Sequence, residues 1–160
     1  MKSNSMCFDI ATRDRVAFIQ SCWHRDIVDR LRDSFLDEFA KLDGRQVDVF
    51  EVPGAFEIPL KAQFLANSGK YAAVVAAGLV VDGGIYRHEF VASAVIDGLM
   101  KTQLASHTPI FSAVLTPHDF ISDGQPEFFA EHFTGKGIES AQACALTLAE
   151  YSREQIALVG

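Results

Sequence analysis

Apolar and polar residues follow one another in blocks that predict alternating strands and helices. Short apolar or period-two runs indicate four strands, at residues 16–20, 47–52, 71–81 and 110–115. Apolar residues at helical spacing indicate five helices, at residues 26–43, 58–67, 89–106, 127–133 and 138–152. The first helix has Asp26 as its expected N-cap and Gly44 as its stop.

Strands that alternate with helices predict an α/β domain with a parallel sheet. We expect three layers, α/β/α, with a four-stranded parallel sheet in flavodoxin-like order. A single domain over residues 14–160 suits a chain of 160 residues, and the mixed polar residues 1–13 are expected to form a flexible arm. Because the sheet is small and the chain has 13 Phe, apolar surface left uncovered predicts a homo-oligomer.

Composition and charge exclude several classes of protein. Hydrophobic residues make up 49% of the chain, which excludes a disordered protein, and no apolar run reaches the ~18 residues of a membrane span. A net charge of −7 without clustered Lys and Arg argues against nucleic acid as a partner. The three cysteines are scattered and include no C-x-x-C pair, so we expect neither a metal site nor a disulfide. The N-terminal residues lack the pattern of a secretion signal, and we therefore expect a cytoplasmic protein.

Four loops are expected to meet at the carboxyl edge of the sheet, where α/β proteins bind their ligands. These loops span residues 21–24, 53–57, 82–88 and 116–118. In the third loop Gly83-Gly84 lets backbone N–H groups approach a ligand, and the following helix N-terminus favours an anion. Arg87 adds a positive charge, and His88 can transfer a proton near neutral pH. The loop therefore predicts a site for a small phosphorylated substrate with acid–base chemistry beside it.

Each residue of this site, taken alone, also has a plainer interpretation. Trp23, the one Trp of the chain, can stack on a heterocycle or pack at the rim of the core. Glu57 can bind polyol hydroxyls or serve as an acid at a helix N-terminus. His88 can be a general acid or base or a structural histidine, and Lys136, in a predicted loop at 134–137, can reach an anion or stay solvated.

Taken together, these segments resemble the lumazine synthases over nearly the whole chain. The run from Pro53 to Pro59, P-G-A-F-E-I-P, matches the family's P-G-[AS]-x-E-[IL]-P motif. The run at 78–84 is similar to the family's G-x-V-I-x-G segment. Leu115-Thr116 and Lys136-Gly137 match its L-T and K-G anchors.

The divergent second type of this family is the nearer match, because Trp23-His24 and residues 83–90 follow its pattern. The resemblance implies that 5-amino-6-(D-ribitylamino)uracil condenses with 3,4-dihydroxy-2-butanone 4-phosphate. The products are 6,7-dimethyl-8-ribityllumazine, phosphate and water, in riboflavin biosynthesis. It also implies that no metal or organic cofactor takes part, and that holding two substrates together supplies most of the rate gain. The family's sites lie between neighbouring subunits of a homopentamer or of two stacked pentamers.

The resemblance implies a role for residues in each of three loops. Trp23 stacks on the pyrimidine, and the backbone of Val80 and Val81 reads the pyrimidine edge. The N–H groups of Gly84 and Ile85 face the phosphate. The ribityl chain is lined by four residues of the second loop, Gly54, Ala55, Phe56 and Glu57.

The charged groups of the site depart from the family's pattern in one respect. An ungapped match puts Arg87 at the position of the family's catalytic His, and His88 follows one residue later, about 100° further round a helix. Either His88 takes over the proton transfer, or Arg87 stands there as a group that cannot act as a base. Lys136 keeps its place near the ribityl or phosphate end.

Further departures concern the phosphate and the lid. Ile85 replaces the family's usual Thr, which removes a hydroxyl from the phosphate site. Phe128 falls at or near the family's phosphate-binding Arg, so Arg87 or His132 is expected to supply the missing charge. The aromatic lid that the family takes from a neighbouring subunit falls at Ser112, with Phe111 beside it.

Two other functions are compatible with the sequence. The replaced His favours a catalytically weak protein that binds a lumazine or a flavin on the same scaffold, whereas retention of Glu57, Gly84, His88 and Lys136 favours the synthase. A flavodoxin-like electron carrier requires a Ser/Thr/Gly-rich first loop around the FMN phosphate, which the run at 21–25 lacks.

Overall fold

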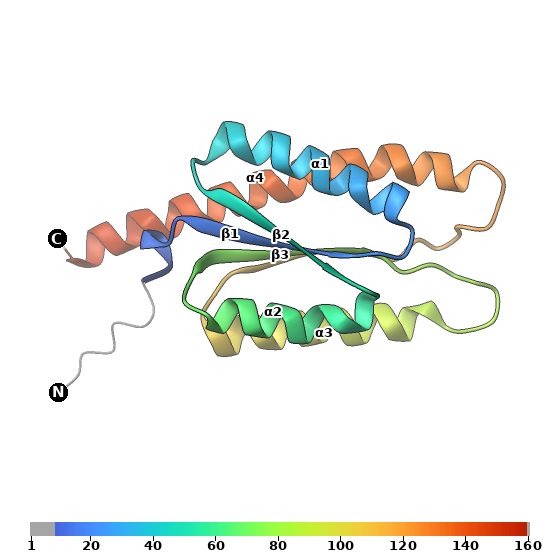
Figure 1. The fold of residues 1–160 in the computed structure, drawn as a ribbon, viewed down its shortest axis with the longest axis horizontal. Coiled ribbons are helices and arrows are strands. Elements are labelled where there is room, and N and C mark those ends of the chain that lie inside the picture. The colour runs from blue at the N-terminus through green and yellow to red at the C-terminus, as the bar shows by residue number, and fades with distance from the viewer. Residues whose placement is uncertain (1–8, 160) are drawn as a thin grey trace.

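A four-stranded parallel sheet forms the centre of the molecule. The computed structural model describes residues 9–159, with side chains described up to residue 154. The strands are β1 (Arg15–Ser21), β2 (Gln46–Val52), β3 (Tyr71–Leu79) and β4 (Ile110–Leu115), and their order across the sheet is β2-β1-β3-β4. All three neighbouring pairs run parallel. This confirms the predicted α/β class and the flavodoxin-like order (Figure 1).

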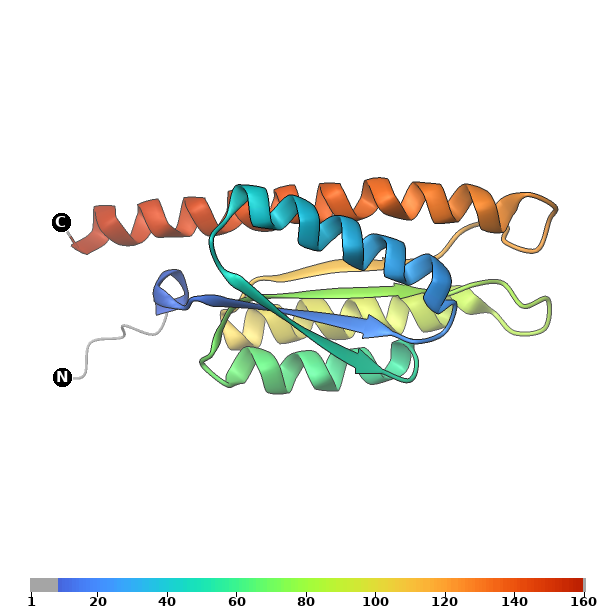
Figure 2. The same ribbon diagram turned by 45° about the horizontal axis from the view of Figure 1, so that its top comes forward.

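Two pairs of helices cover the two faces of the sheet and complete the predicted three layers. One layer holds α1 (Arg25–Leu42) and α4 (Gln125–Val159), and the other holds α2 (Ile58–Asn67) and α3 (His88–Ser106) (Figures 1 and 2). Two short 3₁₀ helices, η2 (Asp9–Thr12) and η3 (Ala55–Glu57), lie outside these layers. Within the described residues, no helix is both long enough and apolar enough to cross a membrane.

The hydrophobic core is divided by the sheet into two halves. The half under α1 and α4 contains Phe18, Phe35 and Phe39, each fully buried, with the Phe18 and Phe35 ring centroids 5.1 Å apart. The half under α2 and α3 is built from smaller side chains such as Ala76 and Val95. Because both faces are covered, every one of the nine residues of β3 is buried, as expected of a central parallel strand.

The two last helices predicted from the sequence are one continuous helix, α4, and the predicted loop at 134–137 is wrong. One of the two glycines in this segment, Gly137, allows close packing between helices. A Cβ on Gly137 would lie 1.9 Å from Ser34 Oγ and 2.3 Å from the Leu31 carbonyl oxygen, both on α1. Only a residue without a side chain lets the two helices approach so closely. Lys136 therefore lies on a helix and not in a glycine-bounded loop.

Three boundaries also differ from the sequence prediction. His24, with φ of 54°, precedes the first residue of α1 as its N-cap, so Asp26 lies inside the first turn. The helix ends at Leu42, with Asp43 as its C-cap in place of a stop at Gly44. In the segment expected to be an arm, Asp9–Thr12 form a 3₁₀ helix and Ile10 is 3% exposed, so this part packs on the domain. Residues 1–8 lie outside the described part.

A small polar network ties the edge strand β2 to the centre of the sheet. The Tyr71 hydroxyl donates a hydrogen bond to Asp48 Oδ2 at 2.9 Å, and Arg15 Nη1 donates to Asp48 Oδ1 at 2.8 Å. Tyr71 belongs to β3, Asp48 to β2 and Arg15 to β1. Burial, and secondly the bond to Asp48, raise the pKa of Tyr71 to about 12. The neutral phenol is therefore the form that the fold stabilises.

Gly137→Ala should destabilise the protein, because the added methyl group collides with the α1 backbone. We expect the free energy of unfolding to fall by about 1–3 kcal/mol, which lowers Tm by roughly 2–10 °C. Gly135→Ala, on the same helix, is the matched control, since a Cβ on Gly135 would have no contact within 4 Å. It should leave Tm unchanged or raise it through helix propensity. Equal effects of the two substitutions in thermal unfolding would contradict the packing role of Gly137.

Tyr71→Phe should change how stability depends on pH. The folded pKa of Tyr71, about 12, lies above the ordinary value of 10.0, so its contribution is fully present below pH 10. This contribution is lost as the pH rises from 10 to 12. Urea unfolding of the wild type should therefore show a steeper loss of stability over this window than Tyr71→Phe shows. Tyr86→Phe, which removes an exposed hydroxyl, should follow the wild-type curve.

Candidate functional site

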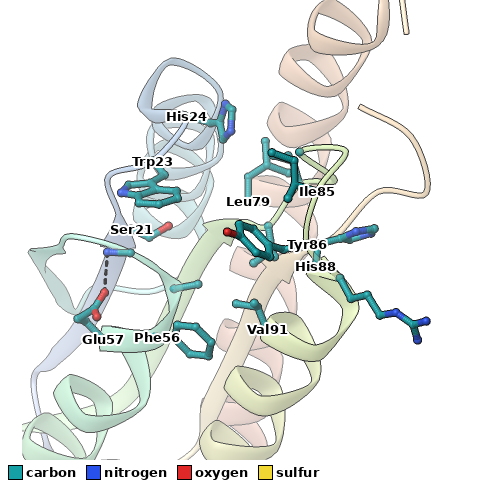
Figure 3. A pocket seen from close by; sticks show the side chains of 16 residues that line it. Ser21, Trp23, His24, Phe56, Glu57, Leu79, Ile85, Tyr86, His88 and Val91 are labelled. Atoms are coloured by element: carbon teal, nitrogen blue, oxygen red, sulfur yellow. Dashed lines mark hydrogen bonds between the residues drawn. The ribbon is translucent and has the colours of Figure 1, made fainter. Parts of the chain in front are cut away.

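A pocket of about 540 Å³ lies at the carboxyl edge of the sheet. It is formed by the loops that follow β1, β2 and β3, together with the first turn of α3 (Figure 3). We expected a ligand site at this edge from the sequence, because parallel strands bring their carboxyl ends together there. Ten of the predicted site residues line it, namely Trp23, Gly54, Ala55, Phe56, Glu57, Val80, Val81, Ile85, Arg87 and His88.

The loop after β1 presents an aromatic ring at the rim of the pocket. The Cys22 N–H is bonded to the carbonyl oxygens of Val52 and Pro53, at 3.0 and 3.3 Å, which ties this loop to the one after β2. Trp23 is 72% exposed, so it does not pack into the core of its own chain. Figure 3 shows its indole above Ser21, at the side of the pocket. An exposed flat ring in this position is free to stack on a heterocycle.

Glu57 lies in the loop after β2 and binds the backbone of its own turn. Its Oε2 accepts a hydrogen bond from the Gly54 N–H at 2.9 Å, drawn as the dashed line in Figure 3, and so closes the turn of η3. The other carboxylate oxygen, Oε1, has no hydrogen-bond partner in the described part of the chain. Glu57 therefore stabilises its own loop and still offers an acceptor to a ligand hydroxyl.

The loop after β3 uses some of its backbone groups within the chain. Gly84, with φ of 81°, donates its N–H to Asp82 Oδ1 at 2.8 Å and does not line the pocket. The Val80 N–H donates to the Leu115 carbonyl oxygen at 2.9 Å, so Val80 has its carbonyl left to offer. Ile85 lines the pocket, and its side chain is 82% exposed. Of the two N–H groups predicted to face a phosphate, only that of Ile85 remains available.

Arg87 and His88 stand at the start of α3 with different surroundings. Arg87 is the N-cap, and its guanidinium carbon lies 5.6 Å from the centre of the Phe90 ring. The His88 side chain is only 10% exposed, and its Nδ1 is 3.6 Å from Glu89 Oε2. Figure 3 shows the His88 imidazole directed away from Trp23 and Glu57. Both residues line the pocket.

The other predicted residues are not brought to this pocket. Phe111 and Ser112 lie on the edge strand β4, the first half-buried and the second exposed. On α4, the His132 ring stacks on Phe128 with centroids 5.8 Å apart. Lys136 Nζ lies 2.7 Å from Glu139 Oε2, and this hydrogen bond lowers the pKa of Glu139. A pocket built from one chain therefore lacks these groups.

Three polar residues of the pocket were missed as site residues by sequence reasoning, Ser21, His24 and Tyr86. Ser21 ends β1, so its place at the carboxyl edge was available as a signal. His24 follows in the same loop and holds its ring edge against Phe120, with centroids 5.1 Å apart. Tyr86 is 85% exposed, and Figure 3 shows its hydroxyl turned into the pocket. Among the described residues no cluster of His, Cys, Asp and Glu could hold a metal ion.

Comparison with known proteins gives one consistent result. Residues 13–152 match the family model described as 6,7-dimethyl-8-ribityllumazine synthase. A protein named 6,7-dimethyl-8-ribityllumazine synthase 2 from Bradyrhizobium diazoefficiens is 58% identical over 86% of this chain and 84% of its own. One of the same name from Pseudomonas syringae pv. tomato is 56% identical over 84% and 81%. A 6,7-dimethyl-8-ribityllumazine synthase from Rhodococcus erythropolis is 58% identical over 84% and 88%.

Proposed function

We propose that this chain, which belongs to the 6,7-dimethyl-8-ribityllumazine synthase family, condenses 5-amino-6-(D-ribitylamino)uracil with 3,4-dihydroxy-2-butanone 4-phosphate. The 5-amino group attacks the ketone, and loss of water gives an imine. Phosphate then leaves, and the ribitylamino nitrogen closes the second ring with loss of another water. The products are 6,7-dimethyl-8-ribityllumazine, phosphate and two molecules of water. We propose the cytoplasm as the place of this reaction.

The observation that carries the proposal is the composition of the pocket at the carboxyl edge of the sheet. It combines an exposed indole, a fixed carboxylate and a glycine-containing loop that leads into Arg87 and His88. An indole suits a pyrimidine ring, and a carboxylate suits the hydroxyls of a ribityl chain. A cation at a helix N-terminus suits a phosphate. The three parts of the two substrates thus have matching groups within one pocket.

The pyrimidine substrate is assigned to the side of the pocket between the first two loops. Trp23 stacks on the ring, and Glu57 Oε1 accepts from a ribityl hydroxyl while Oε2 stays on the Gly54 N–H. Val80 offers its carbonyl oxygen to the pyrimidine edge, since its N–H is used by β4. Gly54, Ala55 and Phe56 line the polyol chain without charge. These contacts hold the substrate in one orientation, which is where most of the rate gain arises.

The butanone phosphate is assigned to the third loop and the start of α3. The Ile85 N–H and the Arg87 guanidinium bind the phosphate, and the Gly84 N–H keeps the loop closed through Asp82. His88 is the group that moves protons during imine formation and ring closure. An imidazole can both accept and donate a proton near neutral pH, whereas a guanidinium stays charged. Arg87 therefore binds and His88 transfers protons.

The complete site is proposed to lie between subunits of a homopentamer or of two stacked pentamers. The large side chains of α2 and the turn before it support an oligomer, since Phe56 is 62%, Leu60 57% and Phe64 66% exposed. Uncovered aromatic and aliphatic groups in such number favour association. We propose that four of the residues absent from the chain's own pocket complete a neighbour's, namely Phe111, Ser112, His132 and Lys136.

A direct assay tests the function, and His88→Asn tests the proton transfer within it. The purified protein with both substrates should form fluorescent lumazine well above the uncatalysed rate. His88→Asn should lower kcat roughly 10²-fold while the Kd for the pyrimidine, followed by quenching of Trp23 fluorescence, changes little. Pyrimidine binding without any acceleration by the wild type would instead identify a lumazine- or flavin-binding protein. Unchanged kcat in the variant would remove His88 from the mechanism.

Arg87→Ala should act on one substrate only. Loss of a charged hydrogen bond to phosphate is expected to raise KM for the butanone phosphate about 10- to 100-fold. The KM for the pyrimidine should stay within about twofold, because Arg87 lies on the α3 side of the pocket. Arg30→Ala, on the exposed face of α1, is the matched control and should change neither value. Equal increases in both KM values would contradict a phosphate-binding Arg87.

A further inference from the structure

Ser21 carries a hydroxyl that the fold itself does not use. The residue ends β1 and is 1% exposed, yet its side chain lines the pocket. Within the described residues its Oγ has neither a hydrogen-bond donor nor an acceptor as partner. The oxygen atom keeps some solvent-accessible surface, so a molecule in the pocket can reach it. An unpaired hydroxyl that is accessible from the pocket can both donate a hydrogen bond to a ligand and accept one from it.

Gly78 leaves the space that this hydroxyl occupies. The pairing of Gln20 with Ala77 places the next residues, Ser21 and Gly78, beside each other on β1 and β3. A Cβ on Gly78 would lie 2.8 Å from Ser21 Oγ, a distance that real Cβ atoms essentially never show. The next atoms, Ile58 Cδ1 and Ser21 Cβ, would lie at ordinary distances of 3.5 and 3.6 Å. The close contact at this point is thus with the hydroxyl alone.

The position of the hydroxyl indicates which part of a ligand it meets. Figure 3 shows Ser21 below the Trp23 indole and close to the second loop, where Glu57 is bonded to Gly54. We propose that Ser21 Oγ hydrogen-bonds the first part of the polyol chain, at its junction with the heterocycle. This assignment rests on the proposed function, which puts the heterocycle on Trp23 and the polyol chain along Glu57. A hydroxyl both donates and accepts, as polyol hydroxyls do.

Ser21→Ala separates this role from a structural one. Removal of Oγ leaves no other group of the described chain unpaired, so Tm should stay unchanged or rise slightly. The KM for the pyrimidine should increase about 3- to 10-fold, the usual effect of one lost hydrogen bond. The kcat and the KM for the butanone phosphate should stay at wild-type values, since Ser21 is a binding residue and takes no part in proton transfer.

Two unreactive ligands locate the contact. Both carry a nitro group in place of the 5-amino group of the pyrimidine, one with the ribityl chain and one with a methyl group instead. Quenching of Trp23 fluorescence gives the Kd of each. Ser21→Ala should weaken the ribityl compound about 3- to 10-fold and leave the methyl compound within twofold. Ser140→Ala, on α4 and outside the pocket, is the matched control and should change neither Kd.

Gly78→Ala supplies a second variant for the same contact. In the wild type the new methyl group displaces Ser21 Oγ, so Tm should fall and the ribityl compound should bind more weakly. In the Ser21→Ala background the same substitution meets atoms only at 3.5 Å or beyond, so both effects should shrink. Such non-additivity is expected of two side chains in direct contact. Additive effects on Tm and Kd would contradict the arrangement.

The outcomes separate this inference from the proposed function. A wild type that neither binds the ribityl compound nor forms lumazine would overturn both. A wild type that does so, with Ser21→Ala binding both compounds as before, would overturn the inference alone. Equal weakening of both compounds would assign Ser21 to the heterocycle and overturn the polyol contact. A large fall in Tm, with kcat and both KM values altered together, would make Ser21 structural.

Discussion

The central strand β3 is buried on both faces along its whole length, and the rest of the structure depends on this. Nine residues without a solvated side chain need a helical layer above and below them, because buried apolar surface must be covered on each side. The two helix pairs supply those layers. Because all neighbouring strands run parallel, the loops after β1, β2 and β3 leave the sheet at the same edge. The pocket forms at that edge, between these loops and the first turn of α3.

Much of the fold follows from simple patterns in the sequence. The apolar run at β3, the period of two at β2 and the spacing by four along α1 each gave the right element, because burial on one or two faces has a clear period. The alternation of strands and helices then indicated the α/β class with a parallel sheet. Local patterns failed where a tertiary contact decides. The segment at 134–137 has the glycine content of a loop, but it is part of α4. Gly137 packs there against Leu31 and Ser34 of α1.

The candidate site was predicted best where a residue type has few uses. Trp23 after a strand and Glu57 after a Pro-Gly break both line the pocket. Ser21 has many common uses, and nothing in the sequence tells that its hydroxyl lacks a partner. Gly84 was expected to offer its N–H outward, but the Asp82 carboxylate, two residues before it, takes that group. Competition of this kind is decided by loop geometry, which residue spacing does not specify.

The hydrogen bond from the Gly54 N–H to Glu57 Oε2 affects the entropy change when a ligand binds at Oε1. Since Oε2 is held by the Gly54 N–H before any ligand arrives, the side chain has already lost most of its rotational freedom during folding. Ordering a flexible glutamate at the moment of binding would reduce affinity by its rotamer entropy. Here that entropy is absent from the binding equilibrium, because the carboxylate is already ordered when a ligand reaches Oε1.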